Sequence, residues 1–230
     1  AYEMLRSLGG LGDVYKRQPN MHNFISETVH NNYVYGAWCV KPEDLKDAIG
    51  GMRALGISGI NVTAPHKVEV MKYIDVVTDG AKKLGSVNTV VNRDGKLYGY
   101  NTDADGFCMA LDKAGIEIEN SRILIIGAGG VVRPTLIRLI DNKPKSITVV
   151  NRTKSKAKTL AEDILKSTGF EVNTEIDKLE FDIVINTTSA GMEPQENVMP
   201  IENIEEINDL SFINENTAAV DMIYLSLIHI

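Results

Sequence analysis

The feature that most constrains this fold is a run of four aliphatic residues, Ile123 to Ile126, that leads directly into Gly127-Ala128-Gly129-Gly130. A helical stripe of apolar residues follows over 131–140. A strand, a glycine-rich turn and a helix in this order are typical of a parallel α/β sheet that holds a dinucleotide pyrophosphate at the helix N-terminus. Val132 stands where the third glycine of the G-x-G-x-x-G pattern would be, so by itself the cluster also fits a simple tight turn.

The end of the next strand indicates which dinucleotide fits. A β-rich run over 146–150 ends at Asn151, about 20 residues after the glycines, as the dinucleotide pattern requires. An NAD site favours Asp or Glu there, whereas the 2′-phosphate of NADP requires cations and hydroxyl groups. Basic residues at a helix start are also often only solvated. We predict NADP as the cofactor, bound by Gly127, Ala128, Gly129, Gly130, Val131, Asn151, Arg152, Thr153 and Lys156.

Strands and helices alternate along the rest of the chain. The first half contains a helix over 45–55, a buried strand over 57–62, short helices over 68–74 and 81–84, and a hairpin of 87–91 with 96–100. The second half contains helices over 103–113, 131–140 and 154–166 and strands over 122–126, 146–150, 182–186 and 218–222. This alternation predicts an α/β fold of two domains that meet near residue 103, the second being a Rossmann-like, doubly wound parallel sheet.

The composition excludes several classes of function. A net charge of −7 with no long run of one sign disfavours a nucleic-acid partner. Cys39 and Cys108 lack CxxC spacing, so neither a metal site nor a disulfide framework is indicated, and a reducing compartment is expected. No apolar run approaches the roughly 20 residues that cross a bilayer, and no basic-then-apolar leader opens the chain. We therefore expect a cytoplasmic protein that acts on a small molecule, without a membrane partner.

The two ends do not fit this pattern. Residues 1–18 combine a glycine-rich patch with no strand alternation and no helical stripe, and residues 225–230 form an apolar run after a strand-like segment. We interpret both segments as non-native tails and exclude them from the fold. The expected domains are then 19–102 and 103–224.

Five motifs in order resemble one family. Residues 59–67 (GINVTAPHK) resemble the G-x-N-V-T-x-P-H-K signature of shikimate dehydrogenases, and residues 85–89 (GSVNT) resemble their G-A-V-N-T segment. Residues 99–106 (GYNTDADG) resemble G-x-N-T-D-x-x-G, residues 186–192 (NTTSAGM) resemble N-x-T-S-x-G-M, and residues 221–224 (DMIY) resemble D-x-x-Y. With the glycine turn and a further match that begins at residue 19, the resemblance extends over residues 19–224. Jointly they are highly specific for the shikimate/quinate dehydrogenase family.

The resemblance implies a substrate-binding catalytic domain followed by an NADP domain. It also implies reversible hydride transfer between NADPH and the ring ketone of 3-dehydroshikimate, a step in chorismate and aromatic amino acid biosynthesis. The implied catalytic residues are Lys67 and Asp103. Reduction of a ketone needs a proton donor at the developing alkoxide, which a lysine ammonium can supply while a carboxylate orients it. Which of the two groups holds the proton in the oxidative direction stays open.

The same motifs imply the other site residues. Uncharged hydrogen-bonding side chains suit a polyhydroxylated ring, and the implied substrate-binding set is Asn61, Thr63, Asn88, Thr188 and Tyr224. The implied additions to the cofactor set are Thr187, Ser189 and Met222. Taken singly, such residues are more often helix caps, surface charges or core residues, but their joint order and spacing favour a site. We expect His66 to be structural.

The chain departs from the family pattern near its ends. The family's S-x-S-P-x-x-H-N element binds the substrate carboxylate through two serines. Residues 19–23 (PNMHN) match its end, whereas Lys16 and Gln18 occupy the serine positions. The family's first strand is also expected to be missing or overwritten, and its closing helical segment with a substrate-contacting glutamine is expected to be absent. We hypothesise that the chain binds NADPH but reduces dehydroshikimate poorly or not at all, because a lost strand exposes a sheet edge and loosely held domains position hydride transfer badly.

Other functions compete with this interpretation. An NAD-dependent quinate/shikimate dehydrogenase is the nearest alternative, and Arg152 argues against it. A non-catalytic dinucleotide-binding remnant is a second alternative, against which the retention of Lys67 and Asp103 argues. A methylenetetrahydrofolate dehydrogenase would share the two-domain plan but would not explain the N-V-T-x-P-H-K and N-T-D segments together. The sequence does not decide whether shikimate or quinate is the preferred substrate, or whether the protein is a monomer or a homodimer.

Overall fold

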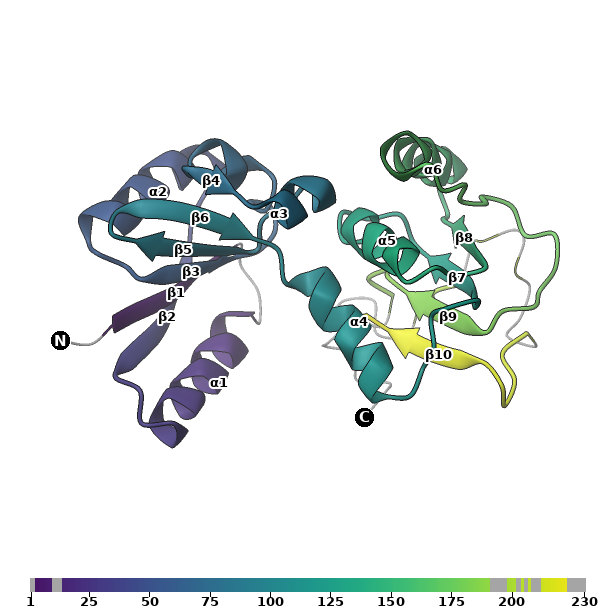
Figure 1. Ribbon diagram of the computed structural model, residues 1–230, viewed down its shortest axis with the longest axis horizontal. Coiled ribbons are helices and arrows are strands. Elements are labelled where there is room, and N and C mark those ends of the chain that lie inside the picture. Colours follow the sequence, from purple (N-terminus) through teal and green to yellow (C-terminus); the bar gives the residue numbers. More distant parts are fainter. Residues whose placement is uncertain are drawn as a thin grey trace. The chain divides into compact units, whose positions relative to one another are not determined.

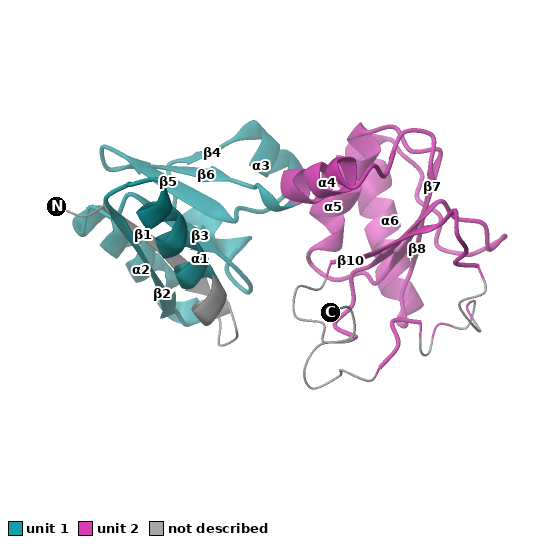
Figure 2. Ribbon diagram, turned by 90° about the horizontal axis from the view of Figure 1, so that it is seen from below, with its two compact units in different colours: residues 1–103 teal, residues 104–230 magenta. Residues whose placement is uncertain are grey.

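The computed structural model describes residues 3–9, 14–190, 198–201, 204, 207 and 212–222, with side chains from residue 18 onward. The chain divides into two compact units, residues 1–103 and 104–230 (Figure 2). Each unit contains one β-sheet. Helix α4 (Asp103–Lys113) begins at the last residue of the first unit and continues into the second.

The first unit is built on a six-stranded mixed sheet of order β2-β1-β3-β5-β6-β4 (Figure 1). The strands are β1 (Glu3–Gly9), β2 (Tyr33–Cys39), β3 (Gly59–Val62), β4 (Val76–Val77), β5 (Thr89–Arg93) and β6 (Lys96–Tyr100). The first three strands are parallel to one another, and β5 is antiparallel to both β3 and β6. The helices are α1 (Val14–Thr28), α2 (Leu45–Ala54) and α3 (Asp79–Leu84), with 3-10 turns η1 (Pro42–Asp44) and η2 (Glu69–Lys72).

The core of the first unit lies where α2 and η2 pack on the sheet. Leu45, Ile49 and Met52 line one face of α2 at helical spacing and are almost completely buried. They pack with sheet residues such as Val90 and Leu97, which are fully buried. This core fixes the ends of β3, β5 and β6, where the polar residues Asn61, Thr89 and Asn101 lie.

The exclusion of residues 1–18 from the fold is wrong for the part of this segment that the structure describes. Residues 3–9 form β1, which pairs with both β2 and β3, and residues 14–18 belong to α1. A strand between two parallel neighbours gains its hydrogen bonds on both sides, so sheet context outweighs a weak local pattern. The sheet edge that a missing first strand would expose is therefore filled, which removes one physical reason for expecting poor activity. The non-native origin of the segment stays a prediction.

Helix α1 covers the edge strand β2. The Asn23 amide group donates a hydrogen bond to the Tyr35 carbonyl oxygen (3.0 Å) and accepts one from the Tyr35 backbone N–H (2.7 Å). The Ser26 hydroxyl donates to the Tyr33 carbonyl oxygen (3.0 Å). These side chains satisfy backbone groups that an uncovered edge would leave open to another strand. As a result, Tyr35 is held firmly in the sheet.

The second unit is a four-stranded parallel sheet of order β10-β9-β7-β8. The strands are β7 (Arg122–Ile126), β8 (Ser146–Val150), β9 (Ile183–Asn186) and β10 (Ala218–Asp221), and the helices after β7 and β8 are α5 (Val132–Asp141) and α6 (Lys154–Thr168). Because the chain adds β8 on one side of β7 and β9 on the other, the strand order reverses between β7 and β9. Ligands of doubly wound sheets bind at the carboxyl ends of the strands beside such a reversal.

The predicted α/β class and doubly wound second sheet are confirmed. Two local predictions differ from the structure: the helix expected over 68–74 is only the 3-10 turn η2, and the first hairpin strand covers 89–93 instead of 87–91. Residues 87 and 88 instead donate backbone hydrogen bonds to Lys67 and Tyr100. No described helix is long and apolar enough to cross a membrane.

Candidate active site

Lys67 lies on the loop that follows β3, and His66 anchors this loop. The His66 ring is 1% exposed, and its Nε2 atom lies 2.8 Å from the Val40 carbonyl oxygen. The backbone N–H groups of Val70 and Val87 donate to the carbonyl oxygens of His66 and Lys67. The loop is therefore held on both sides of the lysine. His66 has the structural part expected for it.

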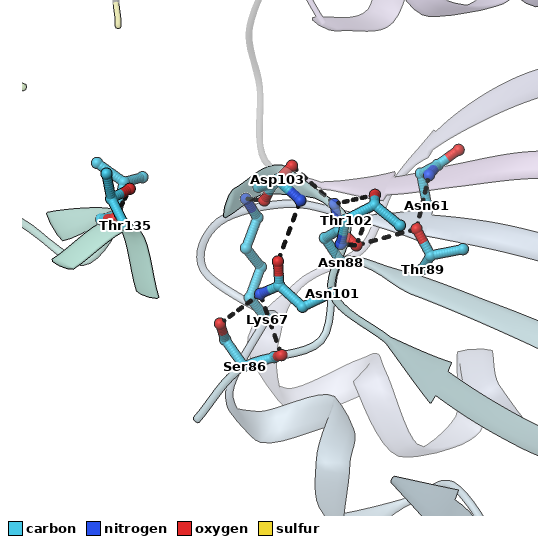
Figure 3. Close-up of polar contacts among 10 residues, drawn as sticks. Asn61, Lys67, Ser86, Asn88, Thr89, Asn101, Thr102, Asp103 and Thr135 are labelled. Atoms are coloured by element: carbon cyan, nitrogen blue, oxygen red, sulfur yellow. Dashed lines mark hydrogen bonds and ion pairs between the residues drawn. The ribbon is translucent and has the colours of Figure 1, made fainter. Parts of the chain in front are cut away.

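Asp103 forms an ion pair with Lys67 at the start of α4. The Lys67 Nζ atom donates to Asp103 Oδ2 at 2.7 Å, with side-chain exposures of 27% for the lysine and 51% for the aspartate. The Asp103 backbone N–H donates to Asn101 Oδ1 (3.1 Å), and Asn101 in turn donates to the Ser86 hydroxyl (2.8 Å) (Figure 3). The structure thus brings together the two residues predicted to be catalytic, at a place that solvent and a small ligand can reach.

Asn88 is the hub that holds this pair in place (Figure 3). It is 7% exposed, and its amide nitrogen donates to Asp103 Oδ1 (2.7 Å) and to the Thr102 hydroxyl (3.0 Å). Its carbonyl oxygen accepts from the Thr102 backbone N–H (3.0 Å) and from the Thr89 hydroxyl (3.0 Å). Each carboxylate oxygen of Asp103 thus has its own donor, so the orientation of the carboxylate is fixed. The contacts of Asn88 therefore support a role in positioning Asp103.

Asn61 and Thr63 lie beside this hub, at the end of β3. Asn61 donates from Nδ2 to the Thr89 hydroxyl (3.3 Å) and accepts at Oδ1 from the Tyr35 hydroxyl (2.9 Å). Thr63 is partly exposed on the same segment. Hydrogen-bonding side chains therefore lie together at the end of β3, and Asn61 is linked through Thr89 and Asn88 to Asp103.

The glycine turn of the second unit fits close against the loop after β9. Gly127 has φ of +116°, a conformation that L-amino acids rarely adopt, and its N–H donates to the Val150 carbonyl oxygen (2.8 Å). A Cβ atom at Gly127 would collide with Thr187 Oγ1 and would lie 3.2 Å from the Thr188 methyl group. In contrast, Cβ atoms at Gly129 and Gly130 would meet nothing within 4 Å, so there the backbone is open to an incoming group.

A cavity of about 300 Å³ opens at this turn. The predicted cofactor residues among its lining are Gly127, Ala128, Gly129, Asn151, Arg152, Lys156, Thr187 and Ser189. Thr188, predicted to contact substrate, lines the same cavity and donates from its hydroxyl to Asn186 Oδ1 (2.8 Å). The cavity thus lies at the carboxyl ends of the parallel strands, with two cations beyond the end of β8.

Some predicted residues lie outside that lining. Gly130, Val131 and Thr153 are exposed near it, and Met222 follows β10, where its N–H donates to the Asn186 carbonyl oxygen (3.0 Å). Tyr224 lies outside the described residues.

Comparison with known proteins identifies the family. The model of the shikimate dehydrogenase substrate binding domain matches residues 15–90, and the model of shikimate / quinate 5-dehydrogenase matches residues 109–222. The shikimate dehydrogenase (NADP(+)) of Geobacillus sp. strain WCH70 is 43% identical over 227 residues, which are 96% of this chain and 79% of that protein.

The chain belongs to the shikimate dehydrogenase family.

Solved structures of the family share its fold. A crystal structure of a shikimate dehydrogenase in complex with NADP+ has a TM-score of 0.84 and 37% identity, covering 97% of this chain and 77% of that chain. Shikimate 5-dehydrogenase from Thermus thermophilus, in complex with NADP(H) and shikimate, has a TM-score of 0.81 and 30% identity, covering 96% of this chain and 79% of that chain. The family predicted from the five motifs is confirmed.

Three residues that contact the site residues were not predicted from the sequence. Thr89 and Thr102 stand inside recognised motifs, but only the contacts of Asn88 reveal their part. Tyr35 lies in no motif and reaches Asn61 across 26 positions of the chain, a contact that no local pattern predicts.

Proposed function

We propose that this chain catalyses the reversible, NADP-dependent reduction of 3-dehydroshikimate to shikimate. The observation that carries the proposal is the Lys67–Asp103 ion pair, held by Asn88 and bordered by neutral hydrogen-bonding side chains. A binding module has no need of a fixed ammonium–carboxylate pair beside such a wall. The family relationship and the names of the relatives, which are NADP-dependent shikimate dehydrogenases, support the same reaction.

The residues of the second unit fit NADP. A Cβ atom would fill the space at Gly127, and the open positions at Gly129 and Gly130 give a pyrophosphate access to backbone N–H groups at the start of α5. Arg152 and Lys156 line the same cavity, where a 2′-phosphate would be bound by a guanidinium fork and an ammonium. NADPH bound there would supply the hydride for reduction, and NADP+ would accept it in the reverse direction. The absence of an acidic residue at Asn151 and Arg152 favours NADP over NAD.

The first unit supplies the proton chemistry. In the reductive direction the developing alkoxide needs positive charge and a proton, and the Lys67 ammonium provides both. Asp103 keeps the ammonium in place through its Oδ2 atom, because Asn88 binds its other oxygen. Asn61 and Thr63 are proposed to bind ring hydroxyl groups, and Thr188 and Tyr224 are proposed as further substrate contacts. In the oxidative direction the same pair receives the proton of the substrate hydroxyl.

We also propose a cytoplasmic location and a monomeric or homodimeric state. Cys39 and Cys108 are free thiols, which suits a reducing compartment.

A steady-state assay tests the proposal. The purified chain is mixed with NADPH and 3-dehydroshikimate, and with shikimate or quinate plus NADP+ or NAD+, while NADPH absorbance is followed. We expect NADP-dependent turnover with shikimate favoured over quinate. The rate should be low, because Lys16 and Gln18 stand at the positions of the two serines that bind the substrate carboxylate in the family. Turnover with NAD+ and quinate alone would favour a quinate dehydrogenase. NADPH binding without turnover, even when the family's two serines and closing helical segment are restored, would favour a non-catalytic remnant.

A further inference from the structure

Tyr35 carries a polar group into the interior of the first unit. Its residue is 4% exposed, and its ring stacks on His22 with centroids 4.3 Å apart. Its hydroxyl lies 2.9 Å from Asn61 Oδ1 and 3.3 Å from Gln18 Oε1. A buried tyrosine hydroxyl normally has a partner, but here the partner is a side chain proposed to bind substrate. The contact therefore joins the edge strand β2 to the site.

The hydroxyl decides which way the Asn61 amide faces. A hydroxyl has one hydrogen, and the shorter contact assigns it to Asn61 Oδ1. With its oxygen occupied in this way, Asn61 must turn its NH₂ group toward Thr89, where Nδ2 lies 3.3 Å from the hydroxyl oxygen. The contact of the same hydroxyl with Gln18 Oε1, at 3.3 Å, is the longer of the two.

The series of hydrogen bonds continues from Thr89 through Asn88 to the ion pair (Figure 3). Thr89, having accepted from Asn61, donates to Asn88 Oδ1 at 3.0 Å. Asn88 in turn donates to Asp103 Oδ1 at 2.7 Å. Each member thus has one assigned direction, and Tyr35 is the buried donor at the head of the series. Networks of this kind resist reorientation because each bond polarises the next.

We propose that Tyr35 is a positioning residue for substrate binding, acting through the amide orientation of Asn61. The inference rests on the proposed function, because the part of Asn61 as a substrate ligand belongs to it. Without the hydroxyl, Asn61 Oδ1 loses its donor and the amide can present either end to a ring hydroxyl. Binding of shikimate then weakens, whereas proton transfer at Lys67 is largely unaffected.

The test compares Tyr35→Phe with Tyr33→Phe. Tyr33 lies two residues earlier on the same strand, and its hydroxyl donates to the His22 backbone carbonyl (3.0 Å), so its loss also removes one hydrogen bond but leaves Asn61 untouched. For Tyr35→Phe we expect KM and the equilibrium Kd for shikimate to rise about threefold to tenfold, the worth of one hydrogen bond, with kcat changed less than about twofold. Tyr33→Phe should leave both constants unchanged. Thermal unfolding of both variants shows whether each is folded.

A double-mutant cycle separates positioning from a general structural effect. On an Asn61→Ala background, Tyr35→Phe should add no further rise in KM or Kd, because the group through which it acts is gone. Equal rises on both backgrounds, or an unchanged KM and Kd in Tyr35→Phe, would overturn the inference while the activity of the unchanged chain upholds the proposed function. If the unchanged chain neither turns over nor binds shikimate, the proposed function fails and the inference fails with it.

Discussion

Alanine substitutions at two glycines of the cofactor turn, Gly127 and Gly129, should impair the protein in different ways. Gly127 has φ of +116°, and a Cβ atom there would collide with Thr187 Oγ1. Gly129 has open space around the position of its Cβ atom and lines the cavity. We therefore expect Gly127→Ala to destabilise the fold, and Gly129→Ala to leave the fold intact but obstruct the cofactor.

The magnitude for Gly127→Ala follows from its contacts. A left-handed backbone costs a residue with a Cβ atom about 1–2 kcal/mol, and an overpacked position costs about 1–3 kcal/mol more. Thr187 has little freedom to move away, because its hydroxyl and its N–H both bind the Ile126 carbonyl oxygen (2.8 and 2.9 Å). A loss of about 3 kcal/mol in the free energy of unfolding corresponds to a fall in Tm of roughly 10 °C for a chain of this size.

Thermal unfolding and NADPH titration of both variants check this reasoning. Gly127→Ala should lower Tm by that amount and also weaken NADPH binding. Gly129→Ala should keep Tm within about 2 °C of the unchanged chain, since its Cβ meets no protein atom, yet lose about tenfold or more in NADPH affinity as its methyl group enters the pyrophosphate path. An unchanged Tm in Gly127→Ala, or unimpaired NADPH binding in Gly129→Ala, would refute the placement of the turn.

Three further substitutions test the cofactor phosphate site, the catalytic lysine and a stabilising ion pair. Arg152→Ala should weaken NADPH binding about tenfold or more but leave NADH binding nearly unchanged, since only the 2′-phosphate loses a charged partner; equal losses for both cofactors in titrations would contradict this. Lys67→Met should lower kcat by about 10²-fold to 10⁴-fold while NADPH affinity stays constant, and retention of full kcat would remove the lysine from catalysis. Hydrogen bonds from Arg122 hold the pKa of Asp182 below its usual value, so this carboxylate stabilises the fold above about pH 4, and the stabilisation is lost as pH falls through its lowered pKa. Asp182→Asn should therefore lower Tm by a few degrees at neutral pH, with the difference from the unchanged chain shrinking toward pH 3; a constant difference would oppose the assignment.

The parts of the site that could be predicted from the sequence lie in contiguous motifs. The glycine turn, the loop of Lys67 and the segment that ends in Asp103 each combine local conformation and chemistry within a few residues. For this reason the glycine and strand-end patterns located much of the cavity lining, and the family that the motifs resemble implied the ion pair.

The parts that escaped prediction depend on contacts between distant segments. β1 forms because β2 and β3 both pair with it, although its own sequence shows little alternation. Asn23 covers an edge strand that only the sheet order reveals. Tyr35 lies in no motif and contacts the site residue Asn61. The sequence predicts Asn88 as a substrate ligand, but it does not show that the Asn88 side-chain amide is already hydrogen-bonded to protein groups such as Asp103. Each of these needs the tertiary fold before its partners can be named.

The activity of the chain is tested most directly by a single turnover, with the chain in excess over 3-dehydroshikimate, NADPH saturating, and the product identified by chromatography. We predict that shikimate forms as NADPH is consumed in equal amount, and that Lys67→Met slows both changes by about 10²-fold to 10⁴-fold while still binding NADPH. NADPH binding by the unchanged chain with no shikimate formed, or shikimate formed equally well by Lys67→Met, would contradict this prediction.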